Sequence, residues 1–166
     1  ADIGVDPARL AVAGSSAGAA LAAGLAQRCA EGELPPIVGV LLHQPVLDDR
    51  PTASKAEFAT TPGFDGAAAQ LMWRHYLGDT APDAASVPAR NHRLIDTPTT
   101  FITCSELDPL RDEAVDYARR LMRCGVRTDL HVFGGTCHGF DSLRPEWAVS
   151  RALFTMQCAA LGRFFA

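Results

Sequence analysis

The amino-acid sequence predicts an α/β fold: a parallel sheet flanked by helices on both faces. Strand-like and helix-like segments alternate four times along the 166 residues, the pattern of parallel strands joined by crossover helices. The composition, 48% hydrophobic and 20% charged, is that of an ordinary globular chain able to bury one core. We therefore expect a single domain over residues 1–166 with four strands.

Four short apolar runs, closed by polar or glycine-containing turns, predict the strands. They cover residues 10–13, 37–42, 99–104 and 130–133. Apolar residues at helical spacing predict four helices. These cover residues 17–30, 65–77, 112–124 and 145–164. The composition of segments 48–64 and 79–98 predicts irregular structure, and that of 134–140 predicts a glycine-rich loop.

Each predicted helix has an apolar face expected to pack on the sheet, and the arginines of the third helix are expected on a solvated face. The apolar faces are Leu21, Leu25 and Ala26; Ala68, Leu71, Met72, His75 and Tyr76; Val115, Ala118, Leu121 and Met122; and Val149, Ala152, Leu153, Met156 and Ala160. The arginines are Arg119, Arg120 and Arg123.

The first strand ends at a serine between two glycines. Ser16 lies two residues from both Gly14 and Gly18, which makes a G-x-S-x-G elbow, whereas Ser15 has alanines at the same spacing. Such a turn lifts the serine oxygen clear of the sheet, and glycine is needed where a β-carbon would collide with the backbone. The helix that follows directs its first N–H groups at any negative charge forming beside Ser16.

Two further polar residues follow predicted strands at the same edge of the sheet. Asp108 comes after the third strand and His138 after the fourth. Ser16, Asp108 and His138 occur in the chain order of α/β-hydrolase triads, in which histidine takes the serine proton and the carboxylate orients the imidazole. Asp108 could alternatively cap a helix, since Pro109 follows it, and Asp112 is then the second candidate for the acid.

The sequence resembles the α/β-hydrolases of the bacterial hormone-sensitive-lipase type, in their C-terminal portion. The segments that carry the resemblance are Gly14 to Gly18, Leu42 to Leu47, Trp73 with Tyr76-Leu77, Asp108 to Glu113, and His138-Gly139-Phe140. The family consists mostly of serine carboxylesterases acting on short- to medium-chain acyl esters. The resemblance therefore implies a small-molecule ester substrate, no cofactor, a catalytic triad of Ser16, Asp108 and His138, and an oxyanion-hole N–H at Ala17.

The chain departs from the family pattern at several points. Ser15 and Ala19 stand where the family usually has Asp and Gly. The family's His-Gly-Gly-Gly oxyanion loop, its cap and the first half of its sheet would all lie before Ala1. We therefore expect a weak catalyst or none, and the alternative function is that of a hydrolase-fold remnant or small-molecule binding domain. Strand 10–13 would then expose an apolar edge, which predicts self-association.

Composition and the remaining residues limit the other function classes. A net charge of −4 gives no basic field for nucleic acid, and no apolar run is long enough for a membrane span. The five cysteines are scattered without a C-x-x-C pair, so we expect neither disulfides nor a metal site, and a cytoplasmic location. Cys137 beside His138 suggests a thiol mechanism, but free cysteines are usually buried apolar residues. Structural or supporting roles are expected for Glu106, His43, His75, His92 and His131.

Overall fold

The computed structural model describes residues 4–166; residues 1–3 of the expected domain lie outside the described residues. Across the described part, four parallel strands form one sheet in the order β1-β2-β3-β4. The strands are β1 (Ala11–Ser15), β2 (Gly39–His43), β3 (Thr100–Leu107) and β4 (Thr128–Cys137). The predicted α/β class and the four strands are confirmed.

Because the four strands are parallel, their carboxyl ends lie at one edge of the sheet. The register pairs Ser15 with His43, and His43 with Thr103. Every residue of β2 is buried, as expected of a parallel strand covered on both faces. In this described sheet β1 and β4 form the two edges.

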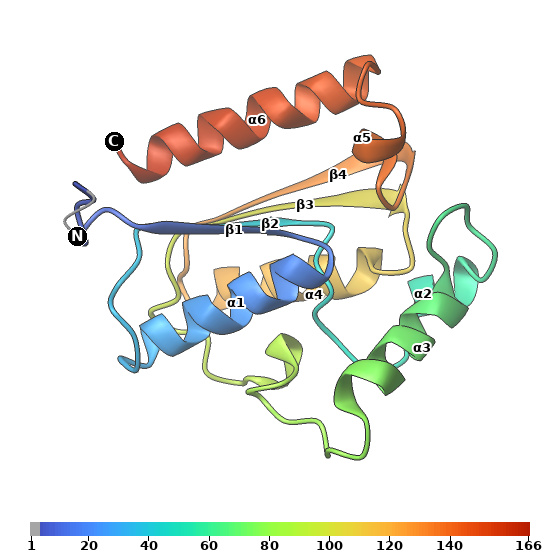
Figure 1. Ribbon diagram of the computed structural model, residues 1–166, viewed down its shortest axis with the longest axis horizontal. Coiled ribbons are helices and arrows are strands. Elements are labelled where there is room, and N and C mark those ends of the chain that lie inside the picture. Colours follow the sequence, from blue (N-terminus) through green and yellow to red (C-terminus); the bar gives the residue numbers. More distant parts are fainter. Residues whose placement is uncertain (1–3) are drawn as a thin grey trace.

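Helices cover both faces of the sheet, as the sequence predicts. The helix α1 (Ala17–Ala30) packs on β1 and β2, and α4 (Arg111–Arg123) packs on β3 and β4 from the same side. The helix α6 (Ala148–Phe164) lies across the opposite face and contacts β2 (Figure 1). The remaining elements are α2 (Ala53–Glu57), α3 (Gly66–Leu77), the 3₁₀ turn η1 (Pro88–Arg90) and α5 (Phe140–Leu143).

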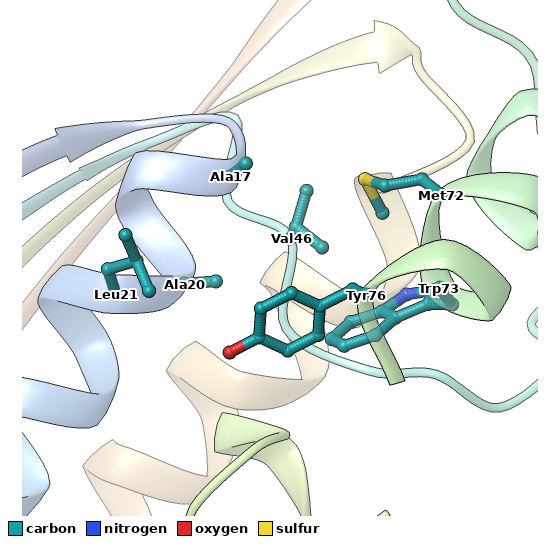
Figure 2. A pocket seen from close by; sticks show the side chains of 7 residues that line it. All are labelled: Ala17, Ala20, Leu21, Val46, Met72, Trp73 and Tyr76. Carbon is teal, nitrogen blue, oxygen red and sulfur yellow. The ribbon is translucent and has the colours of Figure 1, made fainter. Parts of the chain in front are cut away.

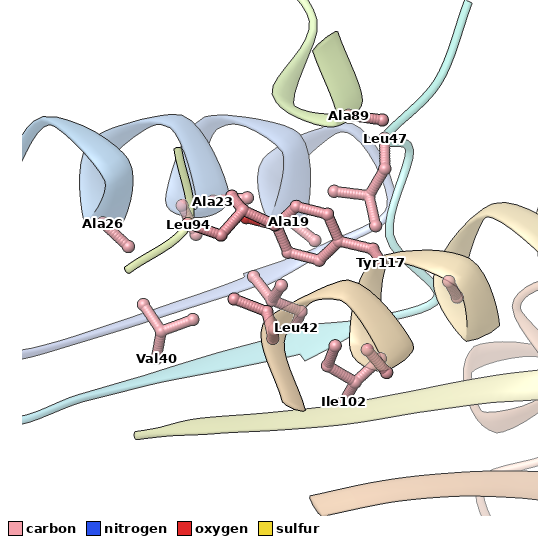
Figure 3. Packing of buried hydrophobic residues seen from close by; sticks show 14 of the residues in the cluster. Ala19, Ala23, Ala26, Val40, Leu42, Leu47, Ala89, Leu94, Ile102 and Tyr117 are labelled. Carbon is pink, nitrogen blue, oxygen red and sulfur yellow. The ribbon is translucent and has the colours of Figure 1, made fainter. Parts of the chain in front are cut away.

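The face that α1 turns to the sheet consists of alanines, not leucines. Leu21 and Leu25 are exposed, with 63% and 38% of their surface accessible, so their predicted burial is wrong. The buried residues are Ala19, Ala22, Ala23, Ala26 and Gln27. These small side chains let the helix lie close to the sheet, where the alanines face the side chains of Val40 and Leu42 (Figure 3).

Other helix faces are also partly wrong. In α3 the buried residues include Ala69 and Trp73, while Leu71 and Tyr76 are exposed. In α4 the predicted Ala118 and Leu121 are buried, together with Ala114 and Tyr117, which the periodicity does not predict. Periodicity predicts burial of Val115 and Met122 in α4 and of Ala152 in α6, but these three residues are exposed. The periodicity identifies these helices correctly, but it does not identify which of their residues face the protein interior.

Arg120 is an exception to the predicted solvated arginine face. Its guanidinium donates hydrogen bonds to the backbone carbonyls of Ala89, at 2.7 Å, and of Asn91. Arg120 therefore ties α4 to the chain around η1, while Arg119 and Arg123 are exposed as expected.

Three loop boundaries differ from the sequence predictions. The segment 48–64 contains the short helix α2, whose first turn is capped by the Thr52 side chain. The strand β4 continues through Gly134 and Gly135 to Cys137, because a bulge between Ser105 and Leu107 lets pairing with β3 resume after a shift in register. The last predicted helix begins later than expected, at Ala148, and a separate short helix, α5, precedes it.

Candidate active site

Ser16 lies in the turn between β1 and α1, in a backbone conformation that a serine rarely adopts. Its φ is 54° and its ψ is −120°, which costs a non-glycine residue about 1–3 kcal/mol. Two backbone hydrogen bonds hold it there: Ser16 N–H donates to the His43 carbonyl at 2.8 Å, and Val46 N–H donates to the Ser16 carbonyl at 3.3 Å. The elbow predicted from the sequence is confirmed.

The two glycines of the elbow have different roles. A β-carbon on Gly14 would lie 2.2 Å from the Gly18 carbonyl oxygen, whereas a β-carbon on Gly18 would meet nothing within 4 Å. The expected steric need for glycine therefore holds at Gly14 and is wrong at Gly18. Because the helix approaches the strand closely, the residue that must lack a β-carbon is Gly14 in the strand and not Gly18 in the helix.

The side chains of Ser16, His138 and Asp108 form one hydrogen-bonded chain. Ser16 Oγ lies 3.0 Å from His138 Nε2, and His138 Nδ1 lies 2.8 Å from Asp108 Oδ2. A neutral imidazole with its proton on Nδ1 donates to the carboxylate and accepts from the serine hydroxyl, which satisfies all three groups. The three predicted residues do converge at one edge of the sheet.

The N-cap of α4 is Leu110, without a side-chain cap hydrogen bond, so Asp108 does not cap this helix. The Asp108 side chain is fully buried; Oδ2 faces His138, while Oδ1 accepts the Leu110 N–H at 2.9 Å just before α4. Asp112, the second candidate for the acid, has other partners than His138. Its carboxylate accepts from the Ser54 N–H and from Arg111, so it secures α2 to α4 and does not contact the imidazole.

The main-chain N–H of Ala17 is the first of helix α1. The first N–H groups of a helix have no acceptor within the helix, and they carry the positive end of its dipole. Ala17 directly follows Ser16, so an oxygen that becomes negative beside Ser16 Oγ would meet this helix end.

The chain matches the family model described as alpha/beta hydrolase fold over residues 1–142. The chain belongs to this family. As an α/β-hydrolase it is 38% identical over 142 residues to the esterase LipI of Mycobacterium tuberculosis, an alignment that covers 83% of this chain and 44% of that protein. These matches also confirm the resemblance to the hormone-sensitive-lipase type of esterase.

Solved structures of esterases share the fold of this chain. The esterase LipW from Mycobacterium marinum superposes with a TM-score of 0.93 at 62% identity, over 94% of this chain and 50% of that one. A bacterial heroin esterase superposes with a TM-score of 0.95 at 37% identity, over 99% and 54%. The chain thus spans about half the length of its relatives.

An apolar hollow of about 110 Å³ opens beside the elbow that carries Ser16. Side chains from α1 and α3 face each other across it, with Val46 between them (Figure 2). The lining residues are Ala17, Ala20, Leu21, Val46, Met72, Trp73 and Tyr76. Its composition suits a hydrocarbon group rather than a charged one.

Two residues that sequence reasoning did not assign to the site contact His138 or the residues beside it. The ring of Phe64 lies 4.9 Å from that of His138, centroid to centroid. Gln44 hydrogen-bonds to the backbone on both sides of His138. Asp141, three residues after His138, accepts from His43 Nε2 at 3.1 Å. His43 is buried and paired at both ring nitrogens, which confirms its structural role. No short-range pattern marks Gln44, since its partners lie far along the chain.

The structure also bears on the thiol mechanism that the sequence suggests for Cys137. Both ring nitrogens of His138 are already occupied, by Ser16 and Asp108, so His138 has no free nitrogen to act as a base for the Cys137 thiol. Glu106 accepts the Gly135 N–H at 2.6 Å, a supporting role as expected.

Within residues 4–166, no group of three or more His, Cys, Asp or Glu side chains could hold a metal ion. In the same range no helix is long and apolar enough to cross a membrane, and the five cysteines are free thiols.

Proposed function

We propose that this chain carries the nucleophile, base and acid of a serine carboxylesterase. The observation that supports this most directly is the continuous chain from Ser16 Oγ through His138 to Asp108, with separations of 3.0 and 2.8 Å. Free serine is a poor nucleophile, and an adjacent base removes that limitation. Membership of a family with esterase relatives supports the same reaction.

In the proposed reaction Ser16 Oγ attacks the ester carbonyl carbon while His138 Nε2 takes its proton. Asp108 holds the imidazole in the tautomer that can accept that proton and stabilises the imidazolium. The Ala17 N–H stabilises the oxygen of the tetrahedral intermediate. His138 then returns the proton to the leaving alcohol, and a water activated by the same imidazole hydrolyses the acyl-enzyme.

The hollow beside Ala17 supports an ester with an apolar acyl group, because alkyl groups gain free energy on leaving water. Short- to medium-chain acids are the substrates that the family resemblance implies. The walls of the hollow come from α1 and α3 within this chain. The leaving alcohol is not specified by any residue of this hollow.

A second candidate is a hydrolase-fold domain that binds ester-like molecules without turnover. The observation that bears on it is that the Ala17 N–H is the oxyanion donor that the residues of this chain place beside Ser16. Loss of one oxyanion donor costs about 10²–10³-fold in kcat in a measured case. A triad without further donors would react with strong electrophiles but would turn over slowly.

Labelling with a fluorophosphonate, followed by turnover of p-nitrophenyl butyrate, separates the two candidates. Labelling that is abolished in Ser16→Ala, together with measurable turnover, supports the esterase. Labelling without turnover supports the binding domain. If the wild-type chain resists labelling, Ser16 is not activated and both forms of the proposal fail.

A subsidiary proposal concerns the edge strand β1. Its outer edge has no neighbouring strand in the described sheet, and such an edge offers unpaired backbone groups to another chain. We propose that copies of this chain associate across β1. Light scattering that gives a monodisperse monomer, with the β1 amides protected from hydrogen exchange, would contradict this.

A further inference from the structure

Gln44 is a buried polar residue at the carboxyl end of β2, held in an unusual backbone conformation. Only 1% of its surface is exposed, and its φ is 44°. A left-handed φ is unfavourable for a residue with a side chain and persists only where the surroundings enforce it. Here the Gln44 N–H donates to the Thr103 carbonyl at 2.7 Å, continuing the pairing of β2 with β3.

The carboxamide of Gln44 is bonded at both ends to the segment that carries His138. Oε1 accepts the Gly139 N–H at 2.8 Å, and Nε2 donates to the Cys137 carbonyl at 3.3 Å and to Ser105 Oγ at 2.7 Å. A backbone N–H can only donate and a carbonyl can only accept, so the orientation of the amide is fixed. The residues immediately before and after His138 are therefore held by one side chain.

We propose that Gln44 is a positioning residue that keeps the His138 imidazole in line between Ser16 and Asp108. The inference rests on the proposed function, since it concerns the same triad. Gln44 acts through the backbone: it fixes Cys137 and Gly139, and with them the direction in which the His138 side chain leaves the chain.

Local structure alone does not fix His138. It lies just after β4 ends at Cys137, and Gly139 follows with a φ of 71°, so the backbone turns sharply on one side of the histidine. Proton transfer depends on this geometry, because a displacement of about 1 Å can cost about 10²-fold in rate. A buried amide that binds both flanking residues is suited to prevent such a displacement.

A second anchor makes the role of Gln44 testable without loss of the whole segment. Asp141, at the start of α5, accepts a hydrogen bond from buried His43. The segment after Gly139 therefore keeps one tie to β2 when Gln44 is replaced. We expect His138 to become mobile while α5 stays in place.

The test compares Gln44→Met with Gln27→Met in the full chain. Gln27 is a matched control: its amide is also buried and fully bonded, to Pro88, Tyr117 and Asn91, but it lies on the far part of α1. Both replacements remove a buried amide of the same size. We expect both variants to show similar losses of thermal stability.

Two readouts report on the triad itself. The first is the downfield proton resonance of His138 Nδ1–H in the hydrogen bond to Asp108, which requires no turnover. The second is the rate of fluorophosphonate labelling. We expect Gln44→Met to broaden or lose the resonance and to slow labelling about 10- to 100-fold, and Gln27→Met to leave both as in the wild type. Where turnover is measurable, kcat falls and KM does not change.

An unchanged His138 resonance and labelling rate in Gln44→Met would overturn the proposal. So would equal effects of the two variants, because Gln44 would then contribute only stability. If Gln44→Met does not fold, Gln44→Glu takes its place, since it keeps an acceptor for Gly139 N–H and loses the donor to Cys137. If the wild type neither labels nor turns over, the proposed function fails, while the resonance still decides the role of Gln44.

Discussion

Lys55 and Glu113 form a buried ion pair that joins the chain after β2 to helix α4. Lys55 Nζ lies 2.6 Å from Glu113 Oε2, and 4% and 0% of the two side chains are exposed. Glu113 Oε1 also accepts the Leu47 N–H at 2.7 Å, and Lys55 donates to the carbonyls of Asp48 and Arg50. Both charges are thus compensated by groups that neighbour the site.

Removing one partner of this pair should strongly destabilise the fold. Burial raises the pKa of Glu113 to about 7, although Lys55 acts to lower it, so without Lys55 the carboxyl must take up a proton or remain an unpaired buried charge. We expect Lys55→Met to lower the free energy of unfolding at pH 8 by about 3–5 kcal/mol, since removing one partner of a buried ion pair is strongly destabilising. Urea denaturation measures the loss. The control is Arg28→Met, which removes an exposed pair with Glu33 and should cost at most about 1 kcal/mol. A similar small loss for Lys55→Met would contradict the prediction.

The elbow predicts opposite outcomes for two similar substitutions. A β-carbon on Gly14 would lie 2.2 Å from a backbone oxygen that cannot move without shifting α1. Gly14→Ala should therefore destabilise the chain by about 3 kcal/mol or more. Gly18→Ala places a methyl group in open space within a helix and should be neutral or stabilise by up to about 1 kcal/mol. Denaturation midpoints of the two variants measure the difference, and equal midpoints would count against the close approach of helix and strand.

The triad could be predicted from the sequence because each member lies in a local pattern. Ser16 has glycines at fixed spacing, and Asp108 and His138 each follow a β-branched or glycine-rich run at a strand end. Parallel strands then bring these ends to one edge of the sheet. The class of fold and the two faces of helices follow from the same alternation.

What could not be predicted depends on distances between segments. Leu21 and Leu25 have the right period for a buried face, but α1 approaches the sheet too closely for leucine and uses alanine instead. Gln44 precedes a proline in a polar turn, which gives no sign that its amide reaches residues 137 and 139. Asp108 accepts the Leu110 N–H in a local turn, which the sequence does not distinguish from the cap of a helix.

Asp141 should make the stability of the chain depend on pH. The hydrogen bond from His43 holds the pKa of Asp141 below its ordinary value of 3.8. A carboxyl with a lowered pKa in the folded state adds stability at pH above its ordinary value, and this is lost as pH falls through the lower folded value. We therefore expect Asp141→Asn to reduce the free energy of unfolding at pH 7 by up to about 1 kcal/mol.

The difference between wild type and Asp141→Asn should shrink as the pH falls from 3.8 through the lower pKa of the folded chain, because the Asp141 carboxyl then becomes neutral, as the carboxamide already is. Urea denaturation at a series of pH values measures it. Asp116→Asn, in an exposed pair with Arg119, serves as the control and should show little difference at any pH. If the difference for Asp141→Asn instead grows in acid, the carboxylate of Asp141 does not stabilise the folded chain.

Asp108 and Asp112 provide the sharpest test of which carboxylate serves the triad. Asp108→Asn keeps the shape and the bond to Leu110, but its amide can donate to His138 Nδ1 and favour the tautomer with the proton on Nε2. That tautomer cannot accept the Ser16 proton. In a serine protease with the same arrangement, this change costs about 10⁴-fold in kcat. We expect Asp108→Asn to slow fluorophosphonate labelling of Ser16 by about 10³–10⁴-fold.

Asp112→Asn is the matched control, because the carboxamide oxygen of the new side chain would still accept the Ser54 N–H that Asp112 now holds. Its ion pair with Arg111 would be lost, but Arg111 keeps a second carboxylate partner in Glu57. The labelling rate of Asp112→Asn should therefore equal that of the wild type. If Asp112→Asn slows labelling as much as Asp108→Asn does, the carboxylates act through the stability of α4 rather than through the imidazole. If only Asp108→Asn slows it, the 2.8 Å contact with His138 Nδ1 is the one on which the reactivity of Ser16 depends.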